Sequence, residues 1–335
     1  MSHVLITGAR GFIGSSLIRY ILEQKVNPEL IDQYEQITKI TAFARNTNDW
    51  TKPRLEGQET VIAAQKEGLL RTVYGDLNGD ISGLCEGVDA VIHLAAKTYV
   101  DHSIRDPGPF VEANTLGTAS LLEDARRQGV EAFITVSTDE VYGQILEGAY
   151  SEDAPINPRN PYAASKAGAD ALTMSYKHTF GMWTAVTRTE NNYGLFQHPQ
   201  KALPVFIGHA IRGENLPVYG DGGHVRQWLY VDDHVRALLM LLRNYKNLPG
   251  GEVWHIAGNQ EITNNQLAET ILGLCDQPTT NIKHIDDFNI RPGHDRRYAL
   301  TCEKMHKLGW RSMVTLEEGL KKCVDWYTAN PSWLG

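Results

Sequence analysis

The first half of the chain alternates apolar, β-branched runs with amphipathic runs, and this alternation is the strongest constraint on its fold. Apolar residues recur at helical spacing over Ile13–Gln24 and Pro109–Gln128. Four runs have the composition of buried strands: His3–Thr7, Ile37–Phe43, Val88–Leu94 and Glu131–Ser137. Strands that alternate with helices build a parallel sheet covered on both faces. We therefore predict an α/β fold with a doubly wound, Rossmann-type parallel sheet.

Past Asn191 the chain becomes rich in proline and glycine, and its predicted elements are shorter. Trp228–Leu242 is predicted as a strand that runs into a helix, and another helix follows Thr263. A last helix opens with the capping-box pattern Thr315-x-x-Glu318. We predict a dinucleotide-binding domain over residues 1–190, to which 228–245 returns. A smaller, mixed, substrate-binding lobe takes up most of 191–335.

The first predicted strand leads directly into GARGFIG, in which Gly8, Gly11 and Gly14 are spaced three apart. Glycine permits a tight turn and the close approach of backbone N–H groups to a pyrophosphate. The helix that begins with Phe12 and Ile13 would direct its positive end at that phosphate. In this strand–loop–helix context the motif predicts a nicotinamide dinucleotide site.

The residues after the second strand bear on the choice of cofactor. An acid there binds the ribose 2′-hydroxyl of NAD, whereas an arginine can accept the 2′-phosphate of NADP. This chain has TAFARN, with Arg45 and no acid from Lys39 to Thr47, which taken alone favours NADP. Asp76 and Leu77, in YGDLN after another short strand, are predicted adenine contacts, although a turn-capping role for Asp76 is equally open.

A tyrosine and a lysine lie four residues apart in PYAASK, as Tyr162 and Lys166. On a helix this spacing places both side chains on one face. A tyrosine hydroxyl has a pKa of about 10 and is a poor base at neutral pH. A nearby lysine cation is expected to lower that pKa, so the pair predicts a proton-transfer site.

Two adjacent acids follow the predicted strand ending in ITVS, within STDEVYG. Thr138, Asp139 and Glu140 place a hydroxyl and two carboxylates side by side. Taken alone, the acids are better explained as solvated loop residues, one of which caps a turn. An acid–base pair with separated pKa values is the functional interpretation.

Taken together, these motifs resemble those of the extended short-chain dehydrogenase/reductase family, over essentially the whole chain. Within it, the chain is most similar to nucleotide-sugar 4,6-dehydratases of the dTDP-glucose 4,6-dehydratase type. The matching segments are GARGFIG, HLAA (His93–Ala96), STDEVYG, YAASK, RTENNYG, LPVYGDG, VRQWLYVDDH and RPGHDRRYAL. The resemblance implies a tightly bound, recycled NAD, with Ala95 and Ala96 among its contacts. It also implies a homodimer.

The resemblance gives the five central residues roles. Thr138 and Tyr162 would address the sugar 4-hydroxyl, with Tyr162 as the base and Lys166 beside it. Oxidation at C4 makes the C5 proton acidic. Glu140 would remove that proton while Asp139 protonates the departing 6-hydroxyl. The product would be an NDP-4-keto-6-deoxyhexose.

The resemblance also implies a set of substrate contacts. Those that match the family are Asn191, Asn192, Lys201, Arg226, Asn259 and Arg291. An arginine suits a diphosphate because its planar fork can bond two oxygens. Three further candidates depart from the family's usual residues: Lys97, Tyr99 and Glu190. These departures leave a modified or amino sugar open as the substrate, beside dTDP-glucose.

Two other functions remain open. An NDP-sugar 4-epimerase or UDP-glucuronate decarboxylase would share Tyr162 and Lys166, but usually has Ser-Glu or Ser-Ser in place of Asp139 and Glu140. A non-catalytic dinucleotide sensor would need the glycine loop alone.

The composition excludes several other classes. The formal net charge is -8 and the basic residues are dispersed, so we expect no nucleic-acid partner. The four cysteines have no metal-ligand spacing, and we predict no metal site. No apolar window is long enough to span a membrane, and the N-terminus lacks a signal-peptide pattern. We expect a cytoplasmic protein with no membrane partner.

Overall fold

The computed structural model describes residues 2–26, 36–46, 54–286 and 294–334. The chain forms two compact units. The first unit comprises residues 1–141, 160–188 and 235–254, and the second comprises 142–159, 189–234 and 255–335.

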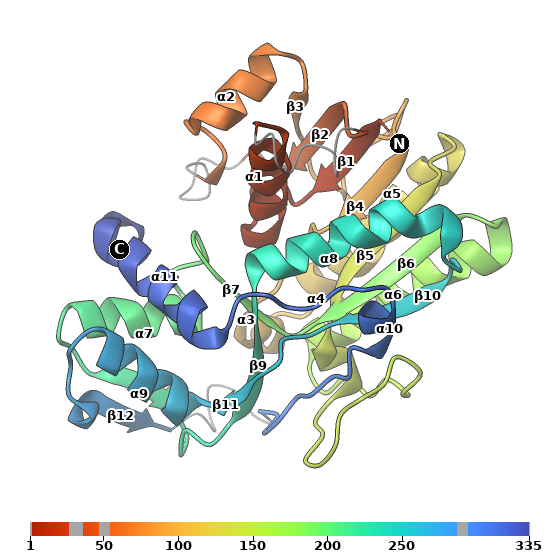
Figure 1. The fold of residues 1–335 in the computed structure, drawn as a ribbon. Coiled ribbons are helices and arrows are strands. Elements are labelled where there is room, and N and C mark those ends of the chain that lie inside the picture. Colours follow the sequence, from red (N-terminus) through yellow and green to blue (C-terminus); the bar gives the residue numbers. More distant parts are fainter. Residues whose placement is uncertain (1, 27–35, 47–53, 287–293, 335) are drawn as a thin grey trace. The chain divides into compact units, whose positions relative to one another are not determined.

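A seven-stranded sheet forms the centre of the first unit (Figure 1), with the strand order β10-β6-β5-β4-β1-β2-β3. Strand β1 pairs in parallel with β2 and with β4. Strand β2 also pairs in parallel with β3, and β4 with β5. The bounds are β1 His3–Thr7, β2 Lys39–Ala44, β3 Leu70–Tyr74, β4 Ala90–His93, β5 Ala132–Thr138, β6 Trp183–Thr189 and β10 Glu252–Ile256. The predicted Rossmann-type α/β fold class is confirmed.

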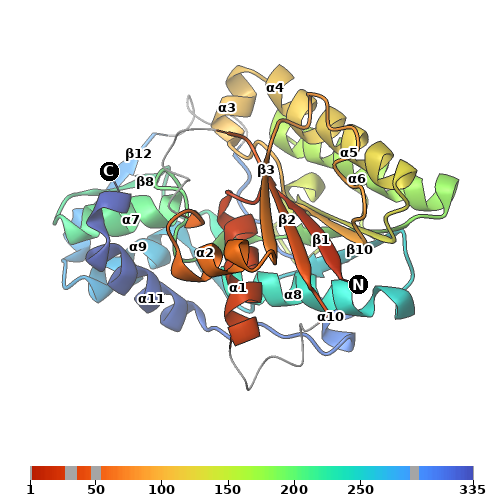
Figure 2. The ribbon, with the colours of Figure 1, turned by 90° about the horizontal axis from the view of Figure 1, so that it is seen from above.

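Helices cover both faces of this sheet. Figure 2 shows α1 and α8 on one face and α5 and α6 on the other. The helices are α1 Phe12–Val26, α2 Glu59–Lys66, α3 Val100–Arg105, α4 Gly108–Phe110, α5 Gly117–Arg127, α6 Pro161–Phe180 and α8 Val231–Asn244. Leu5, Val91, Leu121 and Phe133 belong to the core between strands and helices. All five residues of β1 are buried, which explains the apolar run Val4–Ile6 at its centre.

The helix predicted over Pro109–Gln128 is not a single α-helix. It begins as α4, continues as a π-helical turn over Val111–Leu116 and becomes α5. A π-helical turn often marks a functional position inside a helix. Here it contains the buried Asn114, whose hydrogen bonds are described below.

The second unit has two small sheets, ordered β11-β9-β7 and β12-β8. Their bounds are β7 Asn191–Tyr193, β8 Leu216–Tyr219, β9 Val225–Tyr230, β11 Glu261–Thr263 and β12 Ile282–Ile285. The helices are α7 Ala202–Ile211, α9 Asn264–Leu274, α10 Glu303–Lys307 and α11 Leu316–Ala329. Tyr193, Phe206, Leu267 and Leu320 share its core. The predicted capping box at Thr315 and Glu318 is confirmed.

The unit boundaries differ from the predicted division at residue 190. Residues 142–159 group with the second unit because Ile145 N and Tyr150 N donate to the carbonyls of Arg297 and Ala299 at 3.1 and 2.9 Å. Of the stretch 228–245, only the part from Val235 lies in the first unit. Its beginning is held in the second unit because β9 pairs with β7 and β11.

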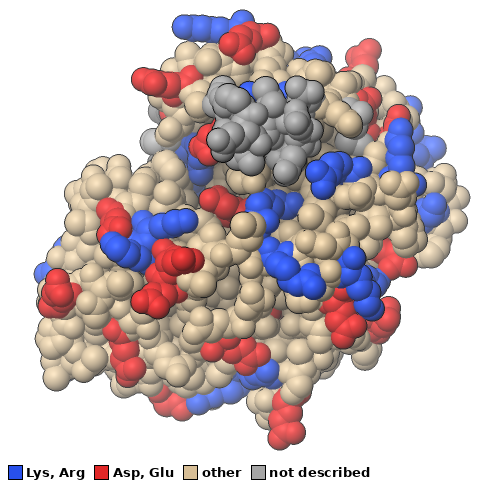
Figure 3. Space-filling model, viewed as in Figure 1, with Lys and Arg blue, Asp and Glu red and all other residues tan. Residues whose placement is uncertain are grey.

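Acidic and basic side chains are interspersed over the face seen in Figure 3. Within the described ranges, no helix is long and apolar enough to cross a membrane.

Candidate active site

Gly8, Gly11 and Gly14 form a tight loop between β1 and α1. Gly8 has a φ of +66°, a left-handed conformation that favours glycine. A Cβ atom at Gly8 would lie 2.8 Å from Ala95 N, and one at Gly11 or Gly14 would collide with the Gly8 carbonyl oxygen. The loop therefore presents bare backbone at the N-terminus of α1, which fits the pyrophosphate of a dinucleotide.

The other predicted cofactor residues lie around this loop. Phe12 and Ile13 are half-buried at the start of α1. Asp76 is exposed, and its Oδ1 accepts a hydrogen bond from Asn78 N at 3.0 Å, so it does cap a turn. The remainder follow the carboxyl ends of neighbouring strands: Ala95 and Ala96 after β4, Asp76 and Leu77 after β3, and Arg45 after β2. Their contacts with a cofactor stay predictions.

Thr138 ends β5, and Asp139 and Glu140 begin a 3₁₀ turn. The Thr138 hydroxyl donates to Asp139 Oδ1 at 3.1 Å and accepts from Glu140 N at 3.3 Å. Asp139 is only 4% exposed, and Glu140 is half-buried. The turn thus fixes both carboxylates at the end of a buried strand, which disfavours their interpretation as solvated loop acids.

Asn160 connects the acid pair to α6. Its Oδ1 accepts from Ala163 N at 2.8 Å and caps the helix, while its Nδ2 donates to Glu140 Oε2 at 2.9 Å. Tyr162 is buried in the first turn of α6, and its N–H donates to Ser103 Oγ at 3.1 Å. One amide therefore fixes both the start of the tyrosine helix and one oxygen of Glu140.

The pKa of Tyr162 is raised, not lowered. Burial is the largest cause and the Glu140 carboxylate is the next, whereas a hydrogen bond with Thr138 acts in the opposite direction. An ionised phenol would add a further negative charge beside Asp139 and Glu140, which explains the direction. The lowering that we expected from Lys166 is not found.

Lys166 is buried on the same face of α6 and donates through Nζ to the Val136 carbonyl at 2.8 Å. Burial lowers its pKa, and Asp170 opposes that change. Asp170 lies one turn further along and forms a buried ion pair with Arg188 Nε at 3.0 Å. Asp170 and Arg188 therefore neutralise each other's charge behind Lys166. Neither residue was predicted from the sequence as a site residue.

Asn114 is a further residue that sequence reasoning missed. Its Oδ1 accepts from Lys97 N at 2.7 Å, and its Nδ2 donates to Lys97 O at 3.0 Å and to Ser165 Oγ at 2.9 Å. Ser165 Oγ in turn donates to the Tyr162 carbonyl at 2.7 Å. The only sequence signal is an amide in the middle of an apolar helical stretch. Asn114 thus links the segment of Lys97 to the helix of Tyr162.

Two predicted substrate residues belong to the first unit. Lys97 is half-buried, and its backbone is held by Asn114 as described. The Tyr99 ring stacks on His102 with centroids 5.1 Å apart. Burial raises the pKa of Tyr99, while Arg54 opposes the change.

The predicted substrate residues around β7 belong to the second unit. Glu190 is buried, and its Oε2 accepts from Gly258 N at 2.9 Å. Asn192 Oδ1 lies 2.9 Å from His234 Nδ1, and its Nδ2 donates to Thr189 Oγ1 and to the Glu190 carbonyl, each at 3.1 Å. Hydrogen bonds within the protein therefore already engage both ends of the Asn192 amide, so its clearest role is structural. Asn191 is half-buried beside it.

Arg226 is also held by its own unit. Nη1 donates to the carbonyls of Val225 and Arg296 at 2.7 and 3.2 Å, and Nη2 donates to the Asp295 carbonyl at 2.8 Å. The guanidinium carbon lies 4.5 Å from the centre of the Tyr298 ring. This arrangement fixes the guanidinium plane.

The last three predicted substrate residues carry less structural information. Lys201 is half-buried and precedes α7, and Asn259 is exposed after β10. Arg291 lies outside the described residues.

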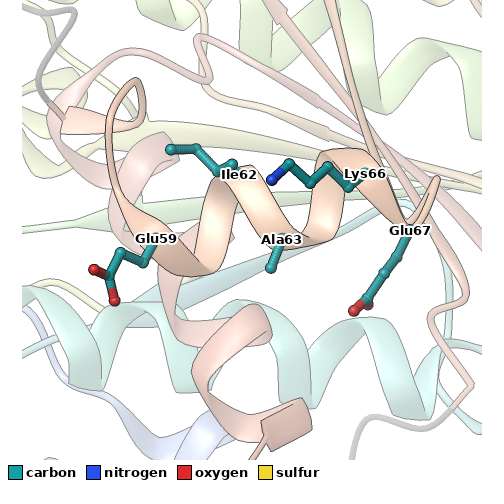
Figure 4. Close-up of a pocket in the computed structure, with 5 residues that line it drawn as sticks. All are labelled: Glu59, Ile62, Ala63, Lys66 and Glu67. Atoms are coloured by element: carbon teal, nitrogen blue, oxygen red, sulfur yellow. The ribbon is translucent and has the colours of Figure 1, made fainter.

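A shallow pocket of about 370 Å³ lies elsewhere, along one face of α2. Figure 4 shows its five lining side chains, which all project from that helix or its end. It includes none of the predicted site residues, and we assign no function to it. Across the ranges that the structure covers, no three His, Cys, Asp or Glu side chains gather as metal ligands.

The chain matches known sequence families over nearly its full length. The family model for GDP-mannose 4,6 dehydratase matches residues 5–323. The dTDP-glucose 4,6-dehydratase of Actinoplanes sp. is 40% identical over 334 residues, covering 98% of this chain and 99% of that protein. The low-salt glycan biosynthesis protein Agl12 of Haloferax volcanii is 39% identical over 326 residues, covering 97% of this chain and 98% of that protein.

Solved structures resemble the whole chain as well. DesIV, a dTDP-glucose 4,6-dehydratase from Streptomyces venezuelae solved with NAD and TYD bound, has a TM-score of 0.86 and 36% identity, covering 99% of this chain and 98% of that chain. A UDP-glucuronic acid 4-epimerase from Bacillus cereus, in complex with UDP-glucuronic acid and NAD, has a TM-score of 0.85 and 25% identity, covering 98% of this chain and 99% of that chain. The chain therefore belongs to the GDP-mannose 4,6 dehydratase family, which confirms the predicted resemblance to nucleotide-sugar 4,6-dehydratases.

Proposed function

We propose that this protein is a nucleotide-sugar 4,6-dehydratase that converts an NDP-hexose into an NDP-4-keto-6-deoxyhexose. The substrate is dTDP-glucose or a related NDP-hexose or amino-hexose. The observation that carries the proposal is the pair Asp139 and Glu140, fixed beside Thr138 and Tyr162 at the carboxyl end of β5. Elimination of water needs both an acid and a base near one ring.

The glycine loop and the ends of β2, β3 and β4 would hold the dinucleotide in the first unit. A dinucleotide held there would supply a hydride acceptor for the oxidation at C4 and a hydride donor for the reduction at C6. Tyr162 is the group placed to take the proton of the 4-hydroxyl, and Thr138 would hold that hydroxyl in place. For this step Lys166 would have to offset the burial and the Glu140 charge that raise the Tyr162 pKa. Lys166 stands behind Tyr162 as a cation on the same helix face.

Glu140 is the base that removes the C5 proton. Asn160 donates a hydrogen bond to one of its carboxylate oxygens and thereby orients the carboxylate. Asp139 is the acid for the departing 6-hydroxyl. Its neighbour Thr138 donates to Oδ1 and thereby orients the carboxyl group. The fixed geometry lets two adjacent residues serve different carbons of one ring.

The second unit would bind the nucleotide diphosphate. In this proposal Arg226 and Arg291 contact phosphate or nucleoside, and Asn191, Lys201 and Asn259 add polar contacts. Lys97 and Tyr99 would contact the sugar from the first unit, and Glu190 would act within the second unit by holding Gly258 N. Asn192 would act indirectly, through its bonds to the backbone of Glu190 and to His234.

The test is incubation of the purified protein with a panel of NDP-hexoses, without added cofactor, followed by mass measurement of the products. We expect loss of one water. The likeness to a solved 4-epimerase makes epimerisation the second candidate, and its product would have unchanged mass. Unchanged mass, or reduced cofactor that accumulates, would exclude the dehydratase. A sensor without catalysis would leave every sugar unaltered.

The proposal extends to a homodimer in the cytoplasm. Val111 and Leu116, on the π-helical turn between α4 and α5, and Phe180, at the end of α6, are large apolar side chains exposed to solvent. The helices α5 and α6 pack against each other, and in this proposal a second copy covers these exposed apolar side chains. Light scattering should give a dimer mass, and Leu116→Glu should shift the measured mass towards that of the monomer.

The proposed cytoplasmic location is supported by the four free cysteines, because thiols stay reduced in a reducing compartment.

A further inference from the structure

The loop between β7 and α7 contains a strained residue. Among the described residues other than glycine, only Phe196 and Asp276 have a positive φ, at +63° and +54°. Aspartate adopts this left-handed conformation comparatively often, and Asp276 follows the end of α9. A bulky residue such as Phe196 rarely adopts it, because its Cβ atom then approaches the following carbonyl oxygen. Strain of this kind persists only where the surrounding structure enforces it, and it is concentrated at functional sites.

Two tryptophan rings hold Phe196 in this conformation. The centroid of the Phe196 ring lies 4.5 Å from that of Trp326 and 5.4 Å from that of Trp333. The centroids of the two tryptophan rings are 5.7 Å apart, so the three rings form one cluster. Trp326 belongs to α11, and Trp333 ends the 3₁₀ turn Pro331–Trp333 that follows it. Aromatic pairs at these separations attract each other beyond what their buried area contributes, and this attraction offsets the strain.

Hydrogen bonds fix the backbone on either side of Phe196. Trp333 Nε1 donates to the Gln197 carbonyl at 2.8 Å. The Tyr327 hydroxyl donates to the Gly194 carbonyl at 3.2 Å and accepts from Gln197 N at 3.1 Å. All of these groups belong to the second unit. The end of α11 and the turn after it therefore hold the loop at both Gly194 and Gln197.

Gln197 extends this constraint to β7. Its side chain is buried, and Nε2 donates to the Asn192 carbonyl at 2.8 Å. At the other end of the loop, Lys201 N donates to the His198 carbonyl at 2.9 Å, directly before α7. The loop is thus tied to the strand at one end and folded on itself at the other. The conformation at Phe196 therefore fixes where Lys201 lies relative to Asn192.

We propose that Trp333 is a positioning residue for substrate binding, which holds loop 194–201 in its binding conformation before the substrate arrives. The inference rests on the proposed function, in which Lys201 contacts the NDP-hexose. A loop that becomes ordered only on binding loses conformational entropy at that moment, which weakens affinity by about tenfold for each residue that is ordered. In this role Trp333 does not contact the substrate. Its loss should therefore weaken binding and leave the conversion of bound substrate unchanged.

The experiment compares the steady-state kinetics of the wild type and its variants. The probes are dTDP-glucose, UDP-glucose and GDP-mannose, and the one that the wild type converts fastest is used throughout. Trp333→Ala should raise KM about tenfold to a hundredfold, the effect of ordering one or two residues, and should leave kcat unchanged. Without substrate, hydrogen–deuterium exchange over loop 194–201 should be faster in this variant than in the wild type. Saturating substrate should restore slow exchange.

Two further variants separate the contacts of Trp333 from a general loss of stability. Trp333→Phe keeps a ring against Phe196 but removes the N–H that donates to the Gln197 carbonyl. Its KM should lie between those of the wild type and Trp333→Ala, and it carries the test if Trp333→Ala does not fold. Ser332→Ala is the matched control, because Ser332 is exposed in the same turn. The control should leave KM, kcat and loop exchange unchanged.

Unchanged KM and unchanged loop exchange in the Trp333 variants would overturn the inference and leave Trp333 a structural role alone. A fall in kcat at unchanged KM would also overturn it, because the defect would then lie in the chemistry and not in binding. Dehydration by the wild type would uphold the proposed function in either case. A wild type that converts none of the three sugars would reject the proposed function, and this inference would fall with it.

Discussion

Asn160 donates to Glu140 Oε2 at 2.9 Å with one end of its amide and caps α6 with the other. The base proposed for C5 and the helix that carries Tyr162 are therefore positioned by one side chain. Two substitutions can separate these contributions, because aspartate also caps helices whereas alanine does not.

Asn160→Ala should lose both contributions. We expect the free energy of unfolding to fall by about 1 kcal/mol, the usual value of an N-cap, and turnover to fall as Glu140 loses its partner. Asn160→Asp should keep most of the stability but place a second carboxylate against Glu140, so turnover should fall without a matching loss of stability. Urea unfolding and product formation measure the two effects. Equal turnover of Asn160→Ala and wild type would refute the positioning role.

Substitutions of the proposed acid, Asp139, and of the proposed base, Glu140, should affect different steps of the reaction. Asp139→Asn is expected to slow elimination by roughly 10²–10⁴-fold, the usual contribution of a general acid, while oxidation at C4 stays detectable as reduced cofactor. Glu140→Gln should in addition abolish exchange of the C5 proton with deuterated solvent. Mass and NMR measurements on the sugar distinguish the two. If Asp139→Asn keeps full dehydration, its acid role must be withdrawn.

The buried Asn114 should matter through position. Asn114→Ala leaves Lys97 and Ser165 without their partners, and unsatisfied buried groups of this kind cost on the order of 2–4 kcal/mol in total. Because Ser165 bonds the Tyr162 carbonyl, we also expect the alkaline limb of the pH–rate profile to move. Asn114→Asp keeps the shape but cannot donate to Ser165, and should show the same shift in smaller measure. A loss of stability with an unaltered profile would indicate a purely structural role.

Much of this arrangement follows from local sequence, and the rest depends on contacts that no local pattern encodes. The glycine loop, the strand before Asp139 and the helical spacing of Tyr162 and Lys166 each depend on neighbouring residues, so they could be predicted. Asn114 and Ser165 are 51 residues apart, and their bond exists only after the π-helical turn Val111–Leu116 packs against α6. The raised pKa of Tyr162 has the same origin, since burial and Glu140 cause it.

Two buried histidines should make the protein sensitive to acid. Burial lowers the pKa of His93 and of His234 to about 3, from an ordinary value of 6.5. Between those values the unfolded chain binds a proton that the folded chain does not. Stability is therefore fully present above pH 6.5 and falls as the pH drops towards 3, by about 1.4 kcal/mol per pH unit for each histidine.

Unfolding free energies measured between pH 4 and pH 8, in steps of about one pH unit, define the slope of this dependence. His93→Asn and His234→Asn should each reduce the slope, whatever their effect at neutral pH. His178 is exposed on α6, so His178→Gln is the control and should leave the slope unchanged. Equal slopes in all four proteins would contradict the assignment.

Gly8 and Gly181 allow backbone strain to be separated from collision. Both have a positive φ, +66° and +73°. A Cβ atom at Gly181 would meet nothing within 4 Å, whereas one at Gly8 would lie 2.8 Å from Ala95 N.

Gly181→Ala should therefore cost only the strain of the left-handed conformation, about 1 kcal/mol of stability, and the variant should keep its dinucleotide. Gly8→Ala bears the same strain and must also displace the backbone between β4 and Ala95. We expect a larger loss of stability and a loss of copurifying dinucleotide, because the collision would also displace the glycine loop that is predicted to bind the pyrophosphate. Thermal unfolding and the cofactor content of the two purified variants decide the matter. If both variants lose equal stability and retain equal cofactor, the close approach at Gly8 has no part in binding.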